Sequence, residues 1–245
     1  GKTTMVRGLV EALKANGKKI KLCAPTGRAA KRIAETPGLS SFRPSTIHMF
    51  LRRQERKQEE FDYMIVDESS MIDIELMLEL LAAIPDGANI IFIGDADQLP
   101  PVGPGQPFKD LLEAEKFPIA RLTGNFRQDT FSETVKAARS IIEGKSPKRN
   151  AEFLESDFVF FDVPQAQQAE KILQLYFDSV PNKLDVETVD IQILSPQRPG
   201  HVGMNKLNRL IQDQTTRSSK PVLTKKSGNE DVQIFLGDKV IYRKN

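Results

Sequence analysis

Tyr63-Met64-Ile65-Val66-Asp67-Glu68 is a short apolar run that ends in two adjacent carboxylates. A run of this length, followed directly by polar residues, is typical of a buried strand in a parallel sheet. Similar runs recur along the first half of the chain, and stretches with helical periodicity separate them. This alternation predicts an α/β fold built on a parallel sheet. We expect strands at Ile20–Ala24, Tyr63–Asp67, Ile90–Gly94 and Ala120–Leu122, and helices at Thr3–Ala15, Gly27–Glu35, Ile74–Ala83, Pro107–Glu115 and Phe131–Glu143.

The two carboxylates stand where chemistry is expected. In open α/β sheets, ligands bind beyond the carboxyl ends of the strands. An apolar strand that ends in Asp67 and Glu68 has the Walker B pattern. In that pattern the first carboxylate holds Mg²⁺, and the second accepts a proton from the attacking water. The alternative is structural, because paired acids can also end a strand and cap the following helix.

The chain opens on part of a second motif. Gly1-Lys2-Thr3-Thr4 matches the end of the phosphate-binding loop G-x-x-x-x-G-K-[ST], without its first positions. Backbone N–H groups at a helix start cradle phosphate oxygens, and the lysine adds a positive charge beside them. We therefore expect Gly1, Lys2, Thr3 and Thr4 to bind ATP, with Thr3 and Asp67 as ligands of Mg²⁺.

Two further segments place polar side chains where they can meet a nucleotide. Gln98 lies in the Gly94–Val102 turn, beyond the third apolar run, and can bond a γ-phosphate. Arg127 lies at the end of the first half and can stabilise transition-state charge as an arginine finger does. Taken alone, the first is an ordinary polar turn and the second a surface ion-pair partner. The four elements in this order and spacing are far more specific than any one of them.

Together these motifs resemble those of superfamily 1 helicases, and their details resemble the RecD-like branch, the exodeoxyribonuclease V alpha subunit family. The segments similar to that branch in the first half are Cys23–Ala30 (motif Ia), Ser45–His48, Asp67–Met71 (motif II), Gly94–Pro101 (motif III) and Phe126–Gln128 (motif IV). Those in the second half are Leu194–Arg198, Gly203–Asn208 and Gly237–Val240, the last resembling the entry to an SH3-like insertion.

The resemblance implies a superfamily 1B DNA helicase that couples ATP hydrolysis to 5′–3′ movement on single-stranded DNA in recombination and repair. It implies that Glu68 is the catalytic base, that Gln98 senses the γ-phosphate and that Arg127 supplies the finger. It also implies a path for single-stranded DNA along Pro25, Thr26, Gly27, Arg28, Thr46 and His48.

The same resemblance predicts two domains. Residues 1–130 are expected to form a RecA-like motor domain of the P-loop NTPase fold, and residues 131–245 an incomplete second RecA-like domain. The second is expected to have strands at Phe158–Val163, Ile191–Ser195 and Lys239–Tyr242 and helices at Gln165–Ser179 and Gly203–Gln214, after a linker at Ser146–Asn150.

The sequence also departs from the family's pattern. The phosphate-binding loop lacks its first positions, and the late motifs of the second motor domain do not occur. We therefore interpret the chain as a fragment that folds but hydrolyses no ATP above background. Relatives carry a β-hairpin pin after the position of His48. Here the segment up to Asp62 is short and charged, and Arg52–Glu60 is expected to be a solvated loop or helix end.

Composition limits the compartment and the partners. The chain of 245 residues is 39% hydrophobic, has a net charge of +2 and contains a single cysteine, Cys23. No leader and no apolar run of the roughly 20 residues that span a membrane is present, so we expect a cytoplasmic protein without membrane contact. Seven basic residues and no acidic residue lie between Lys14 and Arg32. Such a cluster favours a phosphate backbone as partner, although it can also be a solubilising surface.

The expected partners are single-stranded DNA and the nuclease or helicase subunits of a recombination complex. Several alternatives stay open. A Pif-type, conjugative-transfer or RNA-directed helicase would share most of these motifs. A P-loop ATPase that acts on proteins would share the nucleotide motifs alone, and its ATPase activity would not rise with DNA. A binding fragment without catalysis is the remaining alternative.

Overall fold

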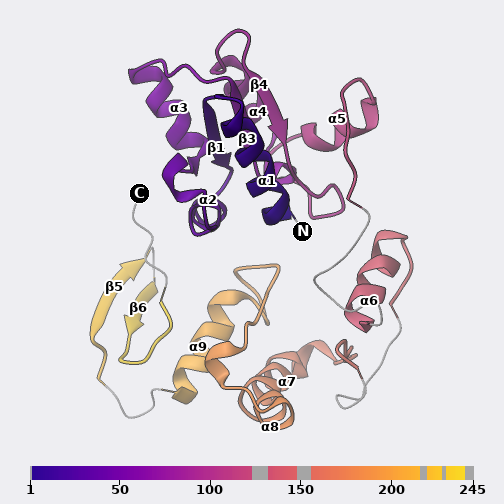
Figure 1. Ribbon diagram of the computed structural model, residues 1–245. Helices are drawn as coiled ribbons and strands as arrows, with labels where there is room; N and C mark the ends of the chain where they lie inside the picture. The colour runs from indigo at the N-terminus through magenta and orange to yellow at the C-terminus, as the bar shows by residue number, and fades with distance from the viewer. Residues whose placement is uncertain (1, 123–131, 148–155, 216–219, 228–229, 241–245) are drawn as a thin grey trace. The chain divides into compact units, whose positions relative to one another are not determined.

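The computed structural model describes residues 2–122, 132–147, 156–215, 220–227 and 230–240 (Figure 1). The chain divides into two units, Gly1–Thr130 and Phe131–Asn245. No helix among the described residues combines the length and the apolar character that crossing a membrane requires.

The first unit is built on a parallel sheet with the strand order β2-β1-β3-β4. The register aligns Cys23 with both Ser45 and Val66, and Val66 in turn with Phe92, so that the carboxyl ends of all four strands lie along one edge. The parallel α/β fold expected from the sequence is confirmed. The strands are β1 (Ile20–Ala24), β2 (Ser45–Thr46), β3 (Tyr63–Val66) and β4 (Asn89–Phe92).

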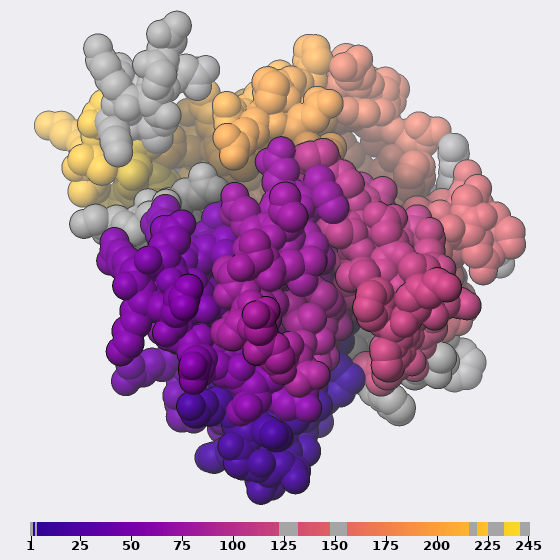
Figure 2. Space-filling view, turned by 90° about the horizontal axis from the view of Figure 1, so that it is seen from above, coloured from indigo at the N-terminus to yellow at the C-terminus, as the bar shows by residue number. Residues whose placement is uncertain are grey.

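Helices cover both faces of this sheet, as the alternating side chains of its strands require. On one face, Leu22 and Ile65 pack with residues of α1 and α2 in one apolar cluster. On the other face, Met64 and Val66 pack with residues of α3 and α4 in a second cluster. Figure 2 shows the side chains of this unit, from indigo to magenta, in continuous contact. The helices are α1 (Lys2–Ala15), α2 (Gly27–Ala34), α3 (Ile47–Arg56), α4 (Ile74–Ala82) and α5 (Pro107–Ala114).

Three of these helices begin at a side chain that caps the first turn. Thr26 Oγ1 accepts a hydrogen bond from Ala29 N, and Thr46 Oγ1 accepts one from Met49 N. An Asp73 carboxylate oxygen accepts one from Leu76 N at 2.9 Å. Each cap satisfies a backbone donor that the helix itself leaves unpaired. Short 3₁₀ turns at η1 (Ser40–Phe42) and η2 (Ser69–Met71) complete the unit.

Several local expectations for the first unit were wrong. Ala120–Leu122 is not a strand, because it pairs with no strand of the described sheet. The short β2 was not expected at all, since two residues carry no readable periodicity. In the Arg52–Glu60 segment the residues up to Arg56 are the end of α3, as one alternative held, and residues 57–60 lie outside the helix. The segment is not fully solvated. Gln54 is buried, and its amide nitrogen donates to Ala83 O at 3.1 Å.

The second unit consists mainly of helices in the described residues. The helices expected at Gln165–Ser179 and Gly203–Gln214 are present, the first divided into 3₁₀, α and π segments. Phe158–Val163 and Ile191–Ser195 are not strands, and neither belongs to a sheet in the part of the chain that the structure describes. The elements are α6 (Glu133–Ile142), η3 (Gln165–Gln167), α7 (Gln168–Gln174), η4 (Leu175–Ser179), α8 (Val180–Leu184), η5 (Thr188–Asp190) and α9 (Met204–Thr215).

The second unit also contains an unexpected hairpin. Strands β5 (Leu223–Ser227) and β6 (Glu230–Ile234) pair antiparallel, whereas the sequence suggested only a later strand at Lys239–Tyr242. Of that later segment, Lys239 and Val240 are not in a strand, and the rest lies outside the described residues. The linker at Ser146–Asn150 also lies partly outside them. The RecA-like nature of this unit stays a prediction.

Candidate functional site: the carboxyl edge of the parallel sheet

The two Walker B carboxylates lie directly beyond β3. Asp67 N donates to Cys23 O at 3.0 Å, so Asp67 continues the ladder with β1 by one hydrogen bond. Glu68 N then donates to an Asp67 carboxylate oxygen at 2.9 Å. Glu68 itself has φ 55° and ψ 39°, the left-handed region that residues with a side chain rarely adopt. This turn ends the strand and sets the direction of the Glu68 side chain, which is 22% exposed.

Motif III reaches the same edge through β4. Ile93 N donates to Val66 O, and Ser69 N donates back to Ile93 O, both at 2.8 Å. These bonds hold the residues after β3 against those after β4. Gly94 follows, and a Cβ atom there would meet the buried ring of Phe108 at 2.8 Å. Glycine is therefore needed for this close approach.

Gln98 lies in the turn that follows. Gln98 N donates to Asp95 O at 3.3 Å, and Asp97 N donates to an Asp95 carboxylate oxygen at 3.1 Å. The Gln98 side chain is exposed. It is therefore outside the core and open to a ligand.

The first turn of α1 borders a hollow of about 370 Å³ on the surface of the first unit. Thr4 and Arg7 line it from α1, and Arg32 lines it from α2, together with Glu35, Thr36 and Pro37. Lys2 is half-buried at the start of the same helix. Gly1 and the side chain of Thr3 lie outside the described residues, and so does the expected Thr3–Asp67 pair. Arg127 lies outside them as well.

One contact links this hollow to the Walker B pair. The Arg32 guanidinium lies 4.0 Å from the Glu68 carboxylate, measured between Nη1 and Oε1. Sequence reasoning missed Arg32 as a site residue. In the sequence Arg32 is only a basic residue in an expected helix. No spacing in the chain indicates that α2 brings this side chain to the end of β3. A fold-level contact of this kind has no local signal.

The residues expected to contact DNA come together from two segments. Ala24 pairs with Thr46 across β1 and β2, so Pro25–Arg28 and Thr46–His48 leave the same edge of the sheet side by side. Gly27, Arg28 and His48 are exposed. Thr26 and Thr46 already serve as helix caps, which gives both hydroxyls a structural role independent of any ligand.

Comparison with known proteins agrees with this architecture. Residues 1–159 match the protein family described as "AAA domain". The ATP-dependent RecD2 DNA helicase of Deinococcus radiodurans is 33% identical over 219 residues, which cover 86% of this chain and 28% of that protein. The chain belongs to the AAA domain family and is RecD-like.

Other relatives extend the likeness. The RecBCD enzyme subunit RecD of Mycobacterium tuberculosis is 33% identical over 141 residues, covering 46% of this chain and 24% of that protein. The ATP-dependent DNA helicase dda of phage T4 is 37% identical over 145 residues, which cover 49% of this chain and 32% of that protein. The RecD-like chain thus spans less than a third of the length of each of these relatives.

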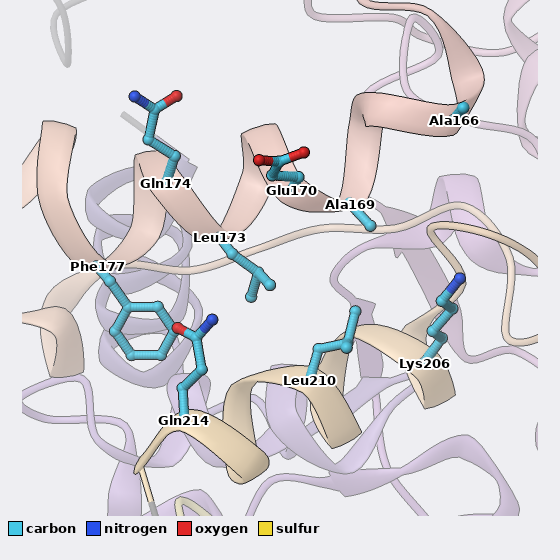
Figure 3. Close-up of a pocket in the computed structure, with 9 residues that line it drawn as sticks. All are labelled: Ala166, Ala169, Glu170, Leu173, Gln174, Phe177, Lys206, Leu210 and Gln214. Carbon is cyan, nitrogen blue, oxygen red and sulfur yellow. The ribbon is translucent and has the colours of Figure 1, made fainter.

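The larger hollow of the RecD-like chain lies elsewhere, in the second unit, and has a volume of about 520 Å³. It runs between α7 and α9, and Figure 3 shows Leu173 and Leu210 facing each other across it. Glu170 and Lys206 stand on opposite walls. Its lining is mainly apolar and includes none of the predicted site residues. The size of a hollow therefore does not identify the candidate site in this chain. The smaller hollow beside α1 adjoins the motifs.

Proposed function

We propose that this chain supplies the ATP-hydrolysing and DNA-engaging core of a DNA helicase that moves 5′ to 3′ on single-stranded DNA in recombination and repair. The observation that carries the proposal is the placement of Asp67 and Glu68 at the carboxyl edge of a parallel sheet. The motif III turn lies beside them, and the first turn of α1 borders the hollow that Arg32 shares. This is where ligands bind in open α/β sheets.

The donor set fits a magnesium nucleotide. Mg²⁺ prefers oxygen ligands and usually takes only one or two carboxylates, with water and phosphate oxygens completing its shell. Asp67 is half-buried, and one of its carboxylate oxygens accepts the Glu68 N–H, which fixes the carboxylate. Asp67 and Thr3 would hold the ion. When bound, the ion neutralises charge that develops on the phosphates.

The remaining roles follow from the same edge. Lys2 and the backbone of Gly1, Lys2 and Thr3 would bind the phosphate oxygens, with Thr4 beginning the helix behind them. Glu68 would accept the proton of the attacking water, for which a carboxylate must lie within hydrogen-bond reach of that water. Gln98 would bond the γ-phosphate. Arg127 would add positive charge at the transferring group.

The proposed DNA path runs along Pro25–Arg28, Thr46 and His48. Exposed Arg28 and His48 can bond phosphate and sugar without reading base identity, as a translocating protein requires. The proposed partners beyond DNA are nuclease or helicase subunits of a recombination complex. The relatives named as RecBCD enzyme subunits support this part of the proposal.

Steady-state ATP hydrolysis tests the proposal. The protein should be expressed from the gene with the sequence that flanks this chain, and assayed with and without saturating single-stranded DNA. We expect DNA-stimulated hydrolysis that falls by about 10²-fold or more in Lys2→Ala and in Glu68→Gln. The 245-residue chain alone is expected to show none. Hydrolysis that is indifferent to DNA would favour an ATPase acting on proteins instead.

Binding of a fluorescent single-stranded oligonucleotide, followed by anisotropy, tests the DNA path. Arg28→Gln with His48→Ala should weaken binding, and binding should fall steeply as salt rises because phosphate contacts release counterions. The matched control is Lys109→Gln on α5, which removes one positive charge from an ion pair with Glu113. Equal loss of affinity in the control and the test variant would mean that net charge, not this path, determines binding.

A further inference from the structure

Helix α2 is a rigid support for one exposed arginine. The helix starts at the Thr26 cap, and Ala30 and Ile33 are buried in the apolar cluster beneath it, at 6% and 4% exposure. Arg32 lies between these two anchors in sequence, on the outer side of the helix, with its side chain 57% exposed. The backbone position of Arg32 is therefore fixed by packing rather than by its own charge.

Among the described residues, hydrogen bonds hold the backbone of Glu68 and not its carboxylate. Its backbone is held by the left-handed turn and by the bond of Glu68 N to Asp67, but the carboxylate has further rotatable bonds. The Arg32 guanidinium lies 4.0 Å from it. An ion pair this exposed contributes little to stability. Stability alone therefore does not account for the arrangement.

The neighbouring charges distinguish Arg32 from the other cations of α2. The Lys31 ammonium pairs instead with Glu35, at 3.6 Å. Arg32 faces Glu68 and also lines the hollow at the first turn of α1, with Thr4 and Arg7. Among the ion pairs of the described residues, the one to a Walker B carboxylate is made by Arg32. A guanidinium stays charged at all working pH values and offers several donors in a fixed plane.

We propose that Arg32 is a positioning residue, which holds the Glu68 carboxylate in the orientation from which it accepts the proton of the attacking water. The inference rests on the proposed function and adds a residue to it. At 4.0 Å the two groups are an ion pair and not yet a hydrogen bond. Contacts of catalytic groups often tighten only when the substrate is bound. The hollow beside Arg32 is where the nucleotide would cause that tightening.

A double-mutant cycle on DNA-stimulated hydrolysis tests this, with the same longer protein. Misplacing a reacting group by about 1 Å can cost ~10²-fold in rate, so Arg32→Gln should lower kcat by roughly ten- to a hundred-fold. The KM for ATP should change little, because Arg32 acts through Glu68. Arg32→Lys should restore part of kcat. In a Glu68→Gln background, Arg32→Gln should have no further effect.

Lys31→Gln is the matched control, since it removes one positive charge from the neighbouring position of the same helix. It should leave kcat unchanged. If Arg32→Gln raises KM and leaves kcat intact, Arg32 binds the nucleotide and the proposal is wrong. Equal losses of kcat in the wild-type and Glu68→Gln backgrounds would also overturn it. A wild-type protein with no ATP hydrolysis overturns the proposed function itself, a result distinct from either of these.

Discussion

Replacement of Gly94 by alanine should destabilise the first unit at the junction between motif II and motif III. The added Cβ would lie 2.8 Å from Phe108 Cε1 and 3.0 Å from both Phe108 Cζ and the backbone nitrogen of Ser70. Carbon atoms at their best separation are about 3.5–4.0 Å apart. Phe108 is buried, and Ser70 N belongs to the η2 turn, so neither neighbour can move aside freely.

The expected cost follows from this overlap. One extra carbon forced into a packed region typically costs about 1–3 kcal/mol. For a unit of this size, 1 kcal/mol corresponds to roughly 4 °C in the unfolding midpoint. We therefore expect the midpoint of Gly94→Ala to fall by about 4–12 °C. Because the clash lies between the segments after β3 and β4, the amides of those two strands should lose the most protection from hydrogen exchange.

Gly8→Ala is a matched control with the opposite expected sign. Gly8 lies within α1, and a Cβ atom there would meet nothing within 4 Å. Alanine in a helix interior is more stable than glycine by roughly 0.5–1 kcal/mol, so this variant should unfold at a higher temperature. The chain contains no tryptophan, so far-ultraviolet circular dichroism is the suitable probe.

Hydrogen exchange of the β3 and β4 amides would locate the change. A Gly94→Ala variant that unfolds at or above the wild-type midpoint would refute the reasoning. It would mean that the segments after β3 and β4 move apart without loss of stability, and hence that they are not packed against each other.

Further expectations concern stability, acid sensitivity and thiol reactivity. Asp73→Ala should lower the free energy of unfolding by about 1 kcal/mol, because it removes the α4 cap, whereas Asp73→Asn should retain most of it in urea titrations. The ammonium of Lys21, which bonds Glu59, lowers the pKa of that carboxyl. The ion pair therefore stabilises the fold above the pKa that Glu59 has in the unfolded chain, and this stabilisation is lost as pH falls through the lower pKa of the folded chain. In Lys21→Met the unfolding midpoint should accordingly fall less steeply with pH on the acid side. Burial raises the pKa of the Cys23 thiol to about 11, so a thiol reagent near neutral pH should modify it quickly only in denaturant. Rapid modification of the native chain would contradict the buried position of β1.

The sequence predicted the parts of the first unit that depend on local pattern. Apolar runs such as Tyr63–Val66, with polar residues directly beyond them, are sufficient to indicate buried parallel strands and their order along the chain. The cap at Thr26 and the left-handed turn at Glu68 were not predicted, and the second is a conformation that residues with a side chain rarely adopt. The family match over residues 1–159 agrees with the same motifs. Motif chemistry therefore identified the family without coordinates.

Strand pairing, by contrast, was decided by the tertiary structure. Ala120–Leu122 and Ile191–Ser195 have strand-like composition, yet they form no strand, because a strand needs a neighbour whose backbone groups it can bond. The two-residue β2 is a strand for the opposite reason, since β1 offers it an edge. A sequence window records the apolar pattern of a segment but not the presence of that neighbour.

The composition of the candidate site shows the same division. The sequence itself determined that Asp67, Glu68 and Gln98 follow the strands of one parallel sheet. Only the tertiary structure brought Arg32 within 4.0 Å of Glu68. The two residues are far apart in the chain, and their approach depends on how Ala30 and Ile33 seat α2 on the sheet. Side-chain chemistry is a local property of the sequence, whereas proximity is a property of the packed core.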